Sequence, residues 1–351
     1  MKLWDSSPKW PWKHDDDIRK YIDVPDWWLV GYEEVRGFLR GLSQAEFMSV
    51  GKSAGGRDLT VAYYGPKKPE RKLCVTGGTH GTEIEGVASV INIIKVLESG
   101  ADLRGEKWPA FQRAAKRVGF YLMPFYNPDA AARSMVKSYV GMPIDLKDNS
   151  DGVHHLHIGF WKNGRLPNRK RIFASWSKDS DMTGKLDGLG YLGQRFNDAG
   201  RLINRPRSRT KSMAVETMQM LKFLDTNNID CYMDLHSHSS PPWLGTCPEE
   251  HHAGDYAQQV KLFELACKLT EKAGGPELVQ GRQGAKTWYN SHFFPANLGI
   301  YGFTYEAMAG FKGNYPDDKP WDEIWLGNAY NGMYTILGLA QALLRVPSPW
   351  G

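Results

Sequence analysis

A histidine and two acidic residues follow an apolar run near residue 80. Residues 74–86 read CVTGGTHGTEIEG, which passes from an apolar segment through glycines to His80, Glu83 and Glu85. If these residues open a helix, their spacing of three places His80 and Glu83 on one face, where an imidazole and a carboxylate can converge on a metal ion, while Glu85 points elsewhere. Two ligands do not complete a zinc site, so we expect another ligand from a second strand end.

The run CYMDLHSHSS supplies such a ligand. Residues 231–235 have strand character, and His236 stands where we expect the strand to stop. His238 follows on the same side of the chain and is the alternative ligand. Two histidines and a glutamate leave one tetrahedral position for water, which is the arrangement of a catalytic zinc site, and zinc brings the pKa of such a water towards about 7.

Hydrolysis at such a site needs a further carboxylate as general base and acid. Glu306 in YGFTYEAM is the candidate, because it follows another β-rich run at 301–305 and would project at the same sheet edge. Ligand sites in open α/β sheets collect beyond the carboxyl ends of the strands, which is where all of these residues are expected.

The elements that must position these residues follow from the apolar pattern. Apolar runs with strand character recur at 73–76, 118–125, 229–235 and 301–305. Apolar positions at helical spacing predict helices over 32–42, 87–97, 213–224 and 329–344. Two β-rich runs flanking SAGG at 53–56 predict a hairpin. Continuous apolar strands alternating with helices predict an α/β fold with a mixed, largely parallel central sheet flanked by helices on both faces.

We expect one catalytic domain over residues 31–351, preceded by an irregular arm rich in Trp and Pro over 1–30. No repeat, low-complexity linker or break in composition divides this domain. Residues 134–203 carry many Gly, Asp, Lys and Arg residues with little periodicity, which predicts a long surface insertion of the kind that is often functional.

Composition limits the classes of partner. The chain has 351 residues and a formal net charge of +5 without a run of like charges, so we expect no nucleic-acid partner. No apolar stretch reaches the roughly 18 residues of a membrane span, and no membrane partner is expected. The sequence does not decide the compartment: it predicts a cytoplasmic protein as it stands, or a secreted or periplasmic protein if a leader has been removed. The four cysteines lack C-x-x-C spacing, which favours free thiols over the alternative of one disulfide.

Several short motifs, taken in order, resemble one known family. HGTE at 80–83, Asn204-Arg205, DLHSHS at 234–239 and FTYE at 303–306 follow one another as in the zinc metallocarboxypeptidases related to carboxypeptidase A. The strand and turn FYLMPFYNPD and the helix AVETMQMLKFL extend the similarity. The resemblance spans most of the chain from about residue 32, apart from 134–203. It indicates a divergent member of the family.

The resemblance implies the chemistry as well as the fold. It implies zinc bound by His80, Glu83 and His236, and hydrolysis of the C-terminal amide bond of a peptide by a zinc-bound water with Glu306 as general base and acid. It implies a peptide or acylated amino-acid substrate with a free carboxylate. The residues that match the family's carboxylate-binding pair are Asn204-Arg205, and an arginine fork meets a carboxylate bidentately.

Two more catalytic residues are assigned by the same resemblance. The family arginine that polarises the scissile carbonyl lies between the NPD turn and Asn204, and Arg169 is assigned to it, with Arg165 and Arg171 as neighbouring alternatives. The family tyrosine that moves onto the substrate is matched by Tyr289 in KTWYNS.

One position departs from the family pattern. The family reads D-L-N-R, and its Asp orients a zinc-binding histidine by hydrogen bonding, whereas Leu202 stands at that position here. Loss of such a partner costs about 10–100-fold in metal affinity or activity unless Asp198 or another group replaces it.

Three functions remain open from the sequence. The first is a zinc metallocarboxypeptidase, the second a zinc-dependent N-acyl amino acid deacylase similar to aspartoacylase or succinylglutamate desuccinylase, and the third a catalytically silent zinc-binding recognition protein. Such deacylases typically carry a further β domain after the catalytic glutamate, whereas only residues 307–351 follow Glu306 here. That difference favours the peptidase, and the presence of Glu306 argues against the silent protein.

Overall fold

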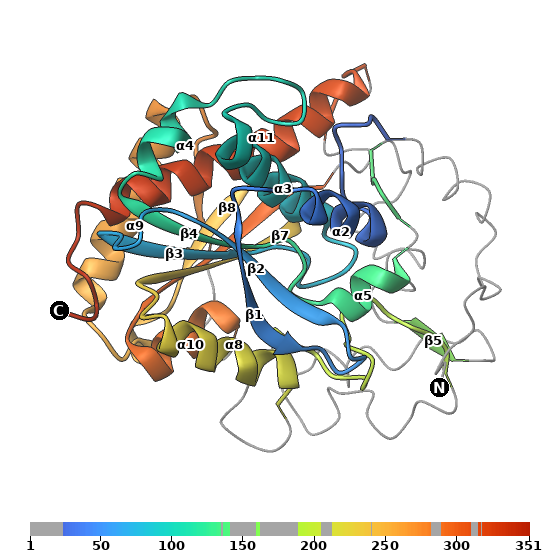
Figure 1. Ribbon diagram of the computed structural model, residues 1–351, viewed down its shortest axis with the longest axis horizontal. Helices are drawn as coiled ribbons and strands as arrows, with labels where there is room; N and C mark the ends of the chain where they lie inside the picture. The colour runs from blue at the N-terminus through green and yellow to red at the C-terminus, as the bar shows by residue number, and fades with distance from the viewer. Residues whose placement is uncertain are drawn as a thin grey trace.

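An eight-stranded sheet runs through the middle of the protein (Figure 1). The computed structural model describes residues 24–134, 136–140, 159–161, 189–204, 213–239, 241–281, 289–309, 315–316 and 318–351. The strand order is β1-β2-β4-β3-β7-β10-β8-β9. In chain order these strands are β1 (Glu46–Lys52), β2 (Asp58–Tyr64), β3 (Arg71–Thr76), β4 (Val118–Met123), β7 (Cys231–Ser239), β8 (Trp243–Thr246), β9 (Val279–Gly281) and β10 (Tyr301–Met308). Strands β5 (Gly159–Trp161) and β6 (Leu189–Leu192) form a separate antiparallel pair.

The centre of the sheet is parallel. Strands β4, β3, β7 and β10 pair in parallel, whereas β1, β2 and β8 join the sheet by antiparallel pairing. Every residue of β4 is buried, as expected for a strand covered on both faces. The predicted mixed, largely parallel sheet is confirmed.

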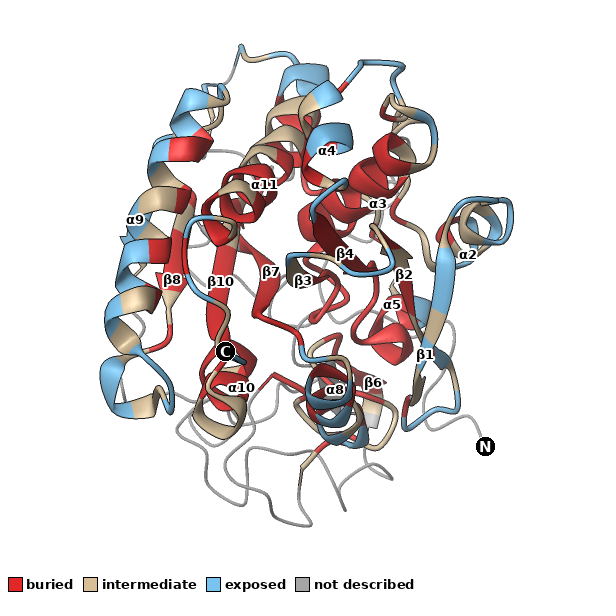
Figure 2. Ribbon diagram, turned by 60° about the vertical axis from the view of Figure 1, so that its left-hand side comes forward, coloured by how far each residue is buried: buried red, intermediate tan, exposed pale blue. Residues whose placement is uncertain are grey.

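Helices cover both faces of this sheet (Figures 1 and 2). They are α2 (Tyr32–Arg40), α3 (Ile84–Ser99), α4 (Pro109–Ala114), α5 (Pro128–Arg133), α8 (Val215–Thr226), α9 (Tyr256–Lys272), α10 (Asn290–Leu298) and α11 (Trp321–Leu343), with a 3-10 turn at Glu249–His251. Helices α3, α4, α9 and α11 share one apolar cluster with the sheet, and α8 and α10 share a second cluster on the opposite face. In Figure 2 the buried strands lie between helices whose outer sides are exposed.

Alternation along the strands decides which side chains reach each face. Val75 and Met233 belong to the cluster of α3 and α11, whereas Cys74 and Tyr232 belong to that of α8 and α10. Because side chains alternate along a strand, the even-numbered residues at the carboxyl ends of β3 and β7 also point to the α8 and α10 side. The candidate metal site therefore lies on this face of the sheet.

Most predicted elements coincide with observed ones, and two local expectations are wrong. The hairpin and the predicted helices and strands are present, although α11 begins at Trp321, earlier than predicted. His80 and Glu83 do not open a helix, because a turn with a hydrogen bond from Glu83 N to His80 O (3.0 Å) precedes α3. His236 does not end its strand, because pairing with β10 continues β7 to Ser239.

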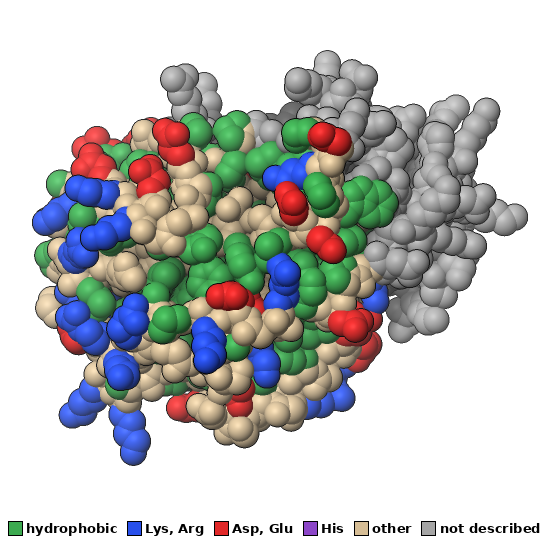
Figure 3. Space-filling model, turned by 90° about the horizontal axis from the view of Figure 1, so that it is seen from above, with side chains coloured by type: hydrophobic (Ala, Val, Ile, Leu, Met, Phe, Trp, Pro, Cys, Tyr) green, Lys and Arg blue, Asp and Glu red, His purple; other side chains and the backbone are tan. Residues whose placement is uncertain are grey.

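Charged side chains of both signs share the surface with hydrophobic ones, as the face in Figure 3 shows. In the described ranges, no helix is long and apolar enough to cross a membrane. All four cysteines are free thiols, so the disulfide alternative is wrong. The arm over 1–30 and the insertion over 134–203 stay predictions, since much of both lies outside the described residues.

Gly86 allows α3 to lie directly on β7. A Cβ added there would lie 2.8 Å from Leu235 Cβ and 3.2 Å from the Leu235 carbonyl oxygen. We expect Gly86→Ala to lower the free energy of unfolding by about 1–3 kcal/mol, measured by chemical denaturation. Gly37 is the matched control, because it is exposed in α2 and its added Cβ meets no atom within 4 Å in the described part of the chain. Gly37→Ala should stabilise by about 0.5–1 kcal/mol, and equal effects at both glycines would contradict this packing.

Candidate metal centre

The predicted metal ligands meet in one buried cluster. His80 Nδ1 lies 2.5 Å from Glu83 Oε1, and His236 Nδ1 lies 2.6 Å from Glu83 Oε2. One ligand atom of each residue lies within 4.8 Å of the others, and none of the three residues is more than 3% exposed. Two imidazole nitrogens and a carboxylate oxygen that converge in this way fit a zinc ion with one position left for water or substrate.

A glycine turn at the end of β3 brings His80 and Glu83 together. Gly78 has a φ of +59°, in the left-handed region that favours glycine, and a Cβ there would lie 3.0 Å from the Pro124 carbonyl oxygen. The chain therefore reverses tightly after Thr76 and then closes the turn from His80 to Glu83 before α3 begins.

Asp234 orients His236. Alternation along β7 places the two side chains on one face, and Asp234 Oδ2 lies 3.0 Å from His236 Nε2. The other oxygen, Oδ1, accepts hydrogen bonds from Thr79 Oγ1 at 2.6 Å and Thr76 Oγ1 at 3.0 Å. The Nε2–H of His236 thus donates to a fixed carboxylate, and Nδ1 faces Glu83, where it can bind a metal once it has lost its proton.

Burial and charge set the protonation of the ligands. Burial lowers the pKa of His80 to about 4, so its imidazole is neutral, the form that binds metal. Burial also opposes a charge on His236, but the carboxylates of Asp234 and Glu83 outweigh it and hold the pKa of His236 well above its usual range. Burial would raise the pKa of Glu83, yet the imidazoles of His80 and His236 hold it well below its usual range. Glu83 is therefore an anionic donor at neutral pH.

Glu306 lies beside the ligand set. Strand β10 pairs in parallel with β7, and Glu306 is the register partner of His236. Register partners on neighbouring strands point to the same face, with the strands about 4.8 Å apart. Glu306 is partly exposed, unlike the buried ligands. A partly exposed carboxylate therefore lies next to a candidate metal ligand.

Arg195 lies beside this cluster, and Asn204 follows it in the same segment of the chain. Arg195 Nη2 lies 3.9 Å from Glu83 Oε1, and the side chain of Arg195 is 18% exposed. Asn204 is 1% exposed, and neither atom of its amide has a hydrogen-bond partner in the described part of the chain. A buried amide without partners is suited to hold a polar group of a ligand.

Comparison with known proteins places the chain in a family. The model of the zinc carboxypeptidases matches residues 42–241, which is more than half of the chain. This protein belongs to the zinc carboxypeptidase family. The resemblance drawn from its motifs is confirmed. No curated protein sequence matches this family member significantly.

Solved structures share the fold of this zinc carboxypeptidase family member. A metallo-carboxypeptidase from Burkholderia cenocepacia is 17% identical with a TM-score of 0.59, covering 88% of this chain and 68% of that one. Carboxypeptidase A from Helicoverpa armigera is 14% identical with a TM-score of 0.58, covering 95% and 80%. A metallo-carboxypeptidase from Pseudomonas aeruginosa, in complex with (2-guanidinoethylmercapto)succinic acid, is 18% identical with a TM-score of 0.55, covering 89% and 69%. At these identities the similarity is one of fold.

The acid missing at Leu202 is not replaced by Asp198. Asp198 pairs with Arg57 and Arg133 and is committed to that network. Asp234 provides a carboxylate partner for the candidate ligand His236 from a different place in the chain, two residues earlier on the same strand. Sequence reasoning missed Asp234, although strand alternation within DLH is the signal that could have found it.

Arg195 was also missed from the sequence. It lies in the segment shared with Asn204, between the NPD turn and the Asn-Arg pair, and that position was the available signal. Arg205, Arg169, Arg165 and Arg171 lie outside the described residues, as does the side chain of the alternative ligand His238. Tyr289 precedes α10, and its ring packs edge-on against His292 with centroids 5.3 Å apart.

We expect zinc to raise the thermal midpoint of unfolding and a chelator to reverse this rise, because the metal binds the folded state. Asp234→Asn should weaken zinc affinity by about 10–100-fold, measured by competition with a chromogenic chelator. Asp230→Asn is the matched control, since Asp230 accepts from Lys72 N at 2.7 Å at the other end of β7. An equal loss of zinc affinity in both variants would mean that Asp234 acts through strand stability rather than through His236.

Proposed function

We propose that this protein is a zinc-dependent metallocarboxypeptidase that hydrolyses the C-terminal amide bond of peptides. The observation that carries this proposal is the buried meeting of His80, Glu83 and His236, with Glu306 in register beside His236. The donor set is that of a catalytic zinc site, and the adjacent carboxylate is the additional group that hydrolysis requires.

Glu306 is the general base and acid in the proposed reaction. A zinc ion held by the three ligands would polarise the scissile carbonyl and lower the pKa of a bound water. Glu306 takes the proton of the attacking water and delivers it to the leaving amine. Its partial exposure gives it access to both water and substrate.

We assign to Arg195 the role of polarising the carbonyl of the scissile bond. A guanidinium held 3.9 Å from Glu83 provides positive charge where the oxygen of the substrate becomes negative. Arg169 was assigned to this role from the sequence, and it stays a prediction. Tyr289 keeps its predicted role as the tyrosine that moves onto the substrate.

Asn204 and Arg205 bind the free carboxylate of the substrate in this proposal. The buried amide of Asn204 has donor and acceptor atoms to offer, and Arg205 is its neighbour in the chain. Arginine recognises carboxylates by paired hydrogen bonds, so the site should require a free C-terminus. The enzyme would then release residues one at a time from the C-terminus of a peptide.

Glu306→Gln should lower kcat by about 100- to 10,000-fold, because the amide cannot accept the proton of water. Zinc content, measured by atomic absorption, should stay at the wild-type value. Glu323→Gln, at an exposed position at the start of α11, is the control and should keep full activity. Unchanged turnover of Glu306→Gln would remove this residue from the mechanism.

Peptides offered as free acids and as C-terminal amides test the substrate class. The zinc-loaded protein should release single residues from the free acids alone, detected by mass spectrometry, because Asn204-Arg205 requires a carboxylate. Cleavage of amides would contradict carboxylate capture. Hydrolysis of N-acyl amino acids without any cleavage of peptides would identify a deacylase, and zinc binding without turnover of either would identify a silent recognition protein.

A further inference from the structure

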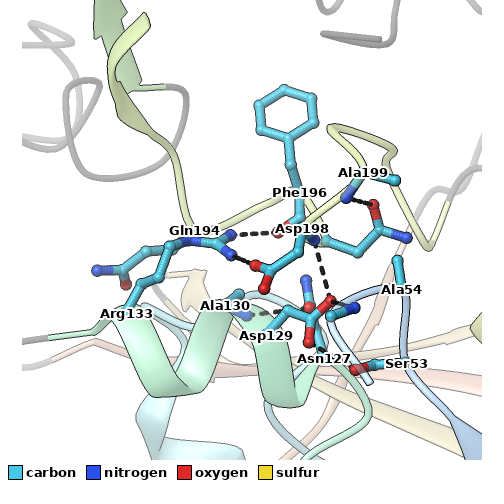
Figure 4. A network of polar contacts seen from close by, with 12 residues as sticks. Ser53, Ala54, Asn127, Asp129, Ala130, Arg133, Gln194, Phe196, Asp198 and Ala199 are labelled. Carbon is cyan, nitrogen blue, oxygen red and sulfur yellow. Dashed lines mark hydrogen bonds and ion pairs between the residues drawn. The ribbon is translucent and has the colours of Figure 1, made fainter. Parts of the chain in front are cut away.

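Two arginines and two aspartates form a network of ion pairs beside the segment of Gln194 and Phe196 (Figure 4). Arg57 Nη1 lies 2.8 Å from Asp129 Oδ1 and 2.8 Å from Asp198 Oδ2. Arg133 pairs with the other oxygen of Asp198, and Asp198 N donates to Asp129 Oδ2 at 3.0 Å. The side chains of Asp129 and Arg133 are 0% and 3% exposed. Because each charge is paired with an opposite charge, the free-energy cost of removing these groups from water is partly offset.

Arg133 makes contacts that Arg57 does not. Its Nη2 donates to the carbonyl oxygens of Phe196 at 2.5 Å and Gly193 at 3.3 Å. These two carbonyls lie on either side of Gln194 and Arg195 in the chain. Figure 4 shows Arg133 reaching from α5 towards Phe196 and Asp198. A single guanidinium thus fixes both ends of the short stretch that presents Arg195.

The same stretch touches the metal-binding turn. Gln194 O accepts a hydrogen bond from Gly81 N at 2.8 Å, between the two ligands of that turn. A Cβ on Gly81 would lie 2.7 Å from the backbone carbon of Ala130 in α5. Helix α5, the metal-binding turn and the Arg195 stretch therefore pack against one another without a spacer, and a shift of one moves the others.

We propose that Arg133 is a positioning residue that aims the guanidinium of Arg195 at the substrate carbonyl. This inference rests on the proposed peptidase function. Arg133 touches no substrate and acts through the backbone of residues 193–196. Lysine cannot replace it, because an ammonium on a single stem cannot pair with Asp198 and hold two carbonyls in the fixed geometry of a guanidinium.

Arg133→Lys should lower kcat by about 100-fold while leaving KM and zinc content unchanged, because a small misplacement of a catalytic group costs rate rather than binding. Arg57→Lys is the matched control. In the described part of the chain the Arg57 guanidinium pairs with the two carboxylates and with neither carbonyl, so this variant should lose stability but keep kcat. Equal losses of kcat in both variants would overturn the inference.

A double-mutant cycle separates positioning from general damage. In an Arg195→Ala background, Arg133→Lys should cause no further loss of kcat, because the two residues act on one group. An additive loss would overturn the proposal. Should Arg133→Lys not fold, Asp198→Asn is the second variant, since it removes the carboxylate partner of Arg133. Because Asp198 also pairs with Arg57, a kcat that falls in Asp198→Asn but not in Arg57→Lys supports the proposal, and a wild-type kcat or an equal fall in both variants overturns it.

Hydrogen exchange supplies a readout that does not need peptidase activity. Exchange of the Gly81 amide, which donates to Gln194 O, should be faster in Arg133→Lys and unchanged in Arg57→Lys. Unchanged exchange in Arg133→Lys would overturn the positioning role. If the wild-type protein cleaves no peptide, the proposed function fails, whereas the exchange of Gly81 still decides whether Arg133 holds the segment.

Discussion

The parallel pairing of β3, β7 and β10 is the constraint on which the site depends. Their hydrogen-bond registers set Thr76 opposite Asp234 and His236 opposite Glu306. Because parallel strands point the same way, the turn after β3 and the ends of β7 and β10 meet at one edge. Strand alternation then places Asp234, His236 and Glu306 on one face, while the odd-numbered neighbours pack in the apolar core. The backbone thereby supplies the precision that a metal site needs.

This arrangement buries several charged side chains, and each of them is stabilised by polar groups close to it. Glu83 lies between two imidazoles, Asp234 is held by two threonine hydroxyls, and each buried aspartate of the neighbouring network meets an arginine. A buried charge left without partners would cost several kcal/mol. Removal of one partner would therefore displace the side chain that it holds. For this reason a residue as far from the metal ligands as Arg133 on α5 can affect the position of Arg195.

The fold and the candidate metal ligands could be predicted from the sequence because both leave short-range signals. The apolar runs of β3, β7 and β10 and the spacing within HGTE are visible in a few consecutive residues. The predicted helical conformation of His80 was wrong because a glycine turn, rather than a helix, brings His80 to Glu83. Arg195 was missed because its segment has no periodicity and owes its place to Arg133, far away in the chain. Long-range hydrogen bonds of this kind leave no pattern in a single sequence.

The most direct test of the account is the position of a bound zinc ion, measured by anomalous diffraction from crystals of the zinc-loaded protein. We expect one strong peak coordinated by Nδ1 of His80, Nδ1 of His236 and a carboxylate oxygen of Glu83, on the face of the sheet that carries Glu306. A peak at another group of residues, or full zinc loading that persists when His236 and Glu83 are both replaced, would contradict it.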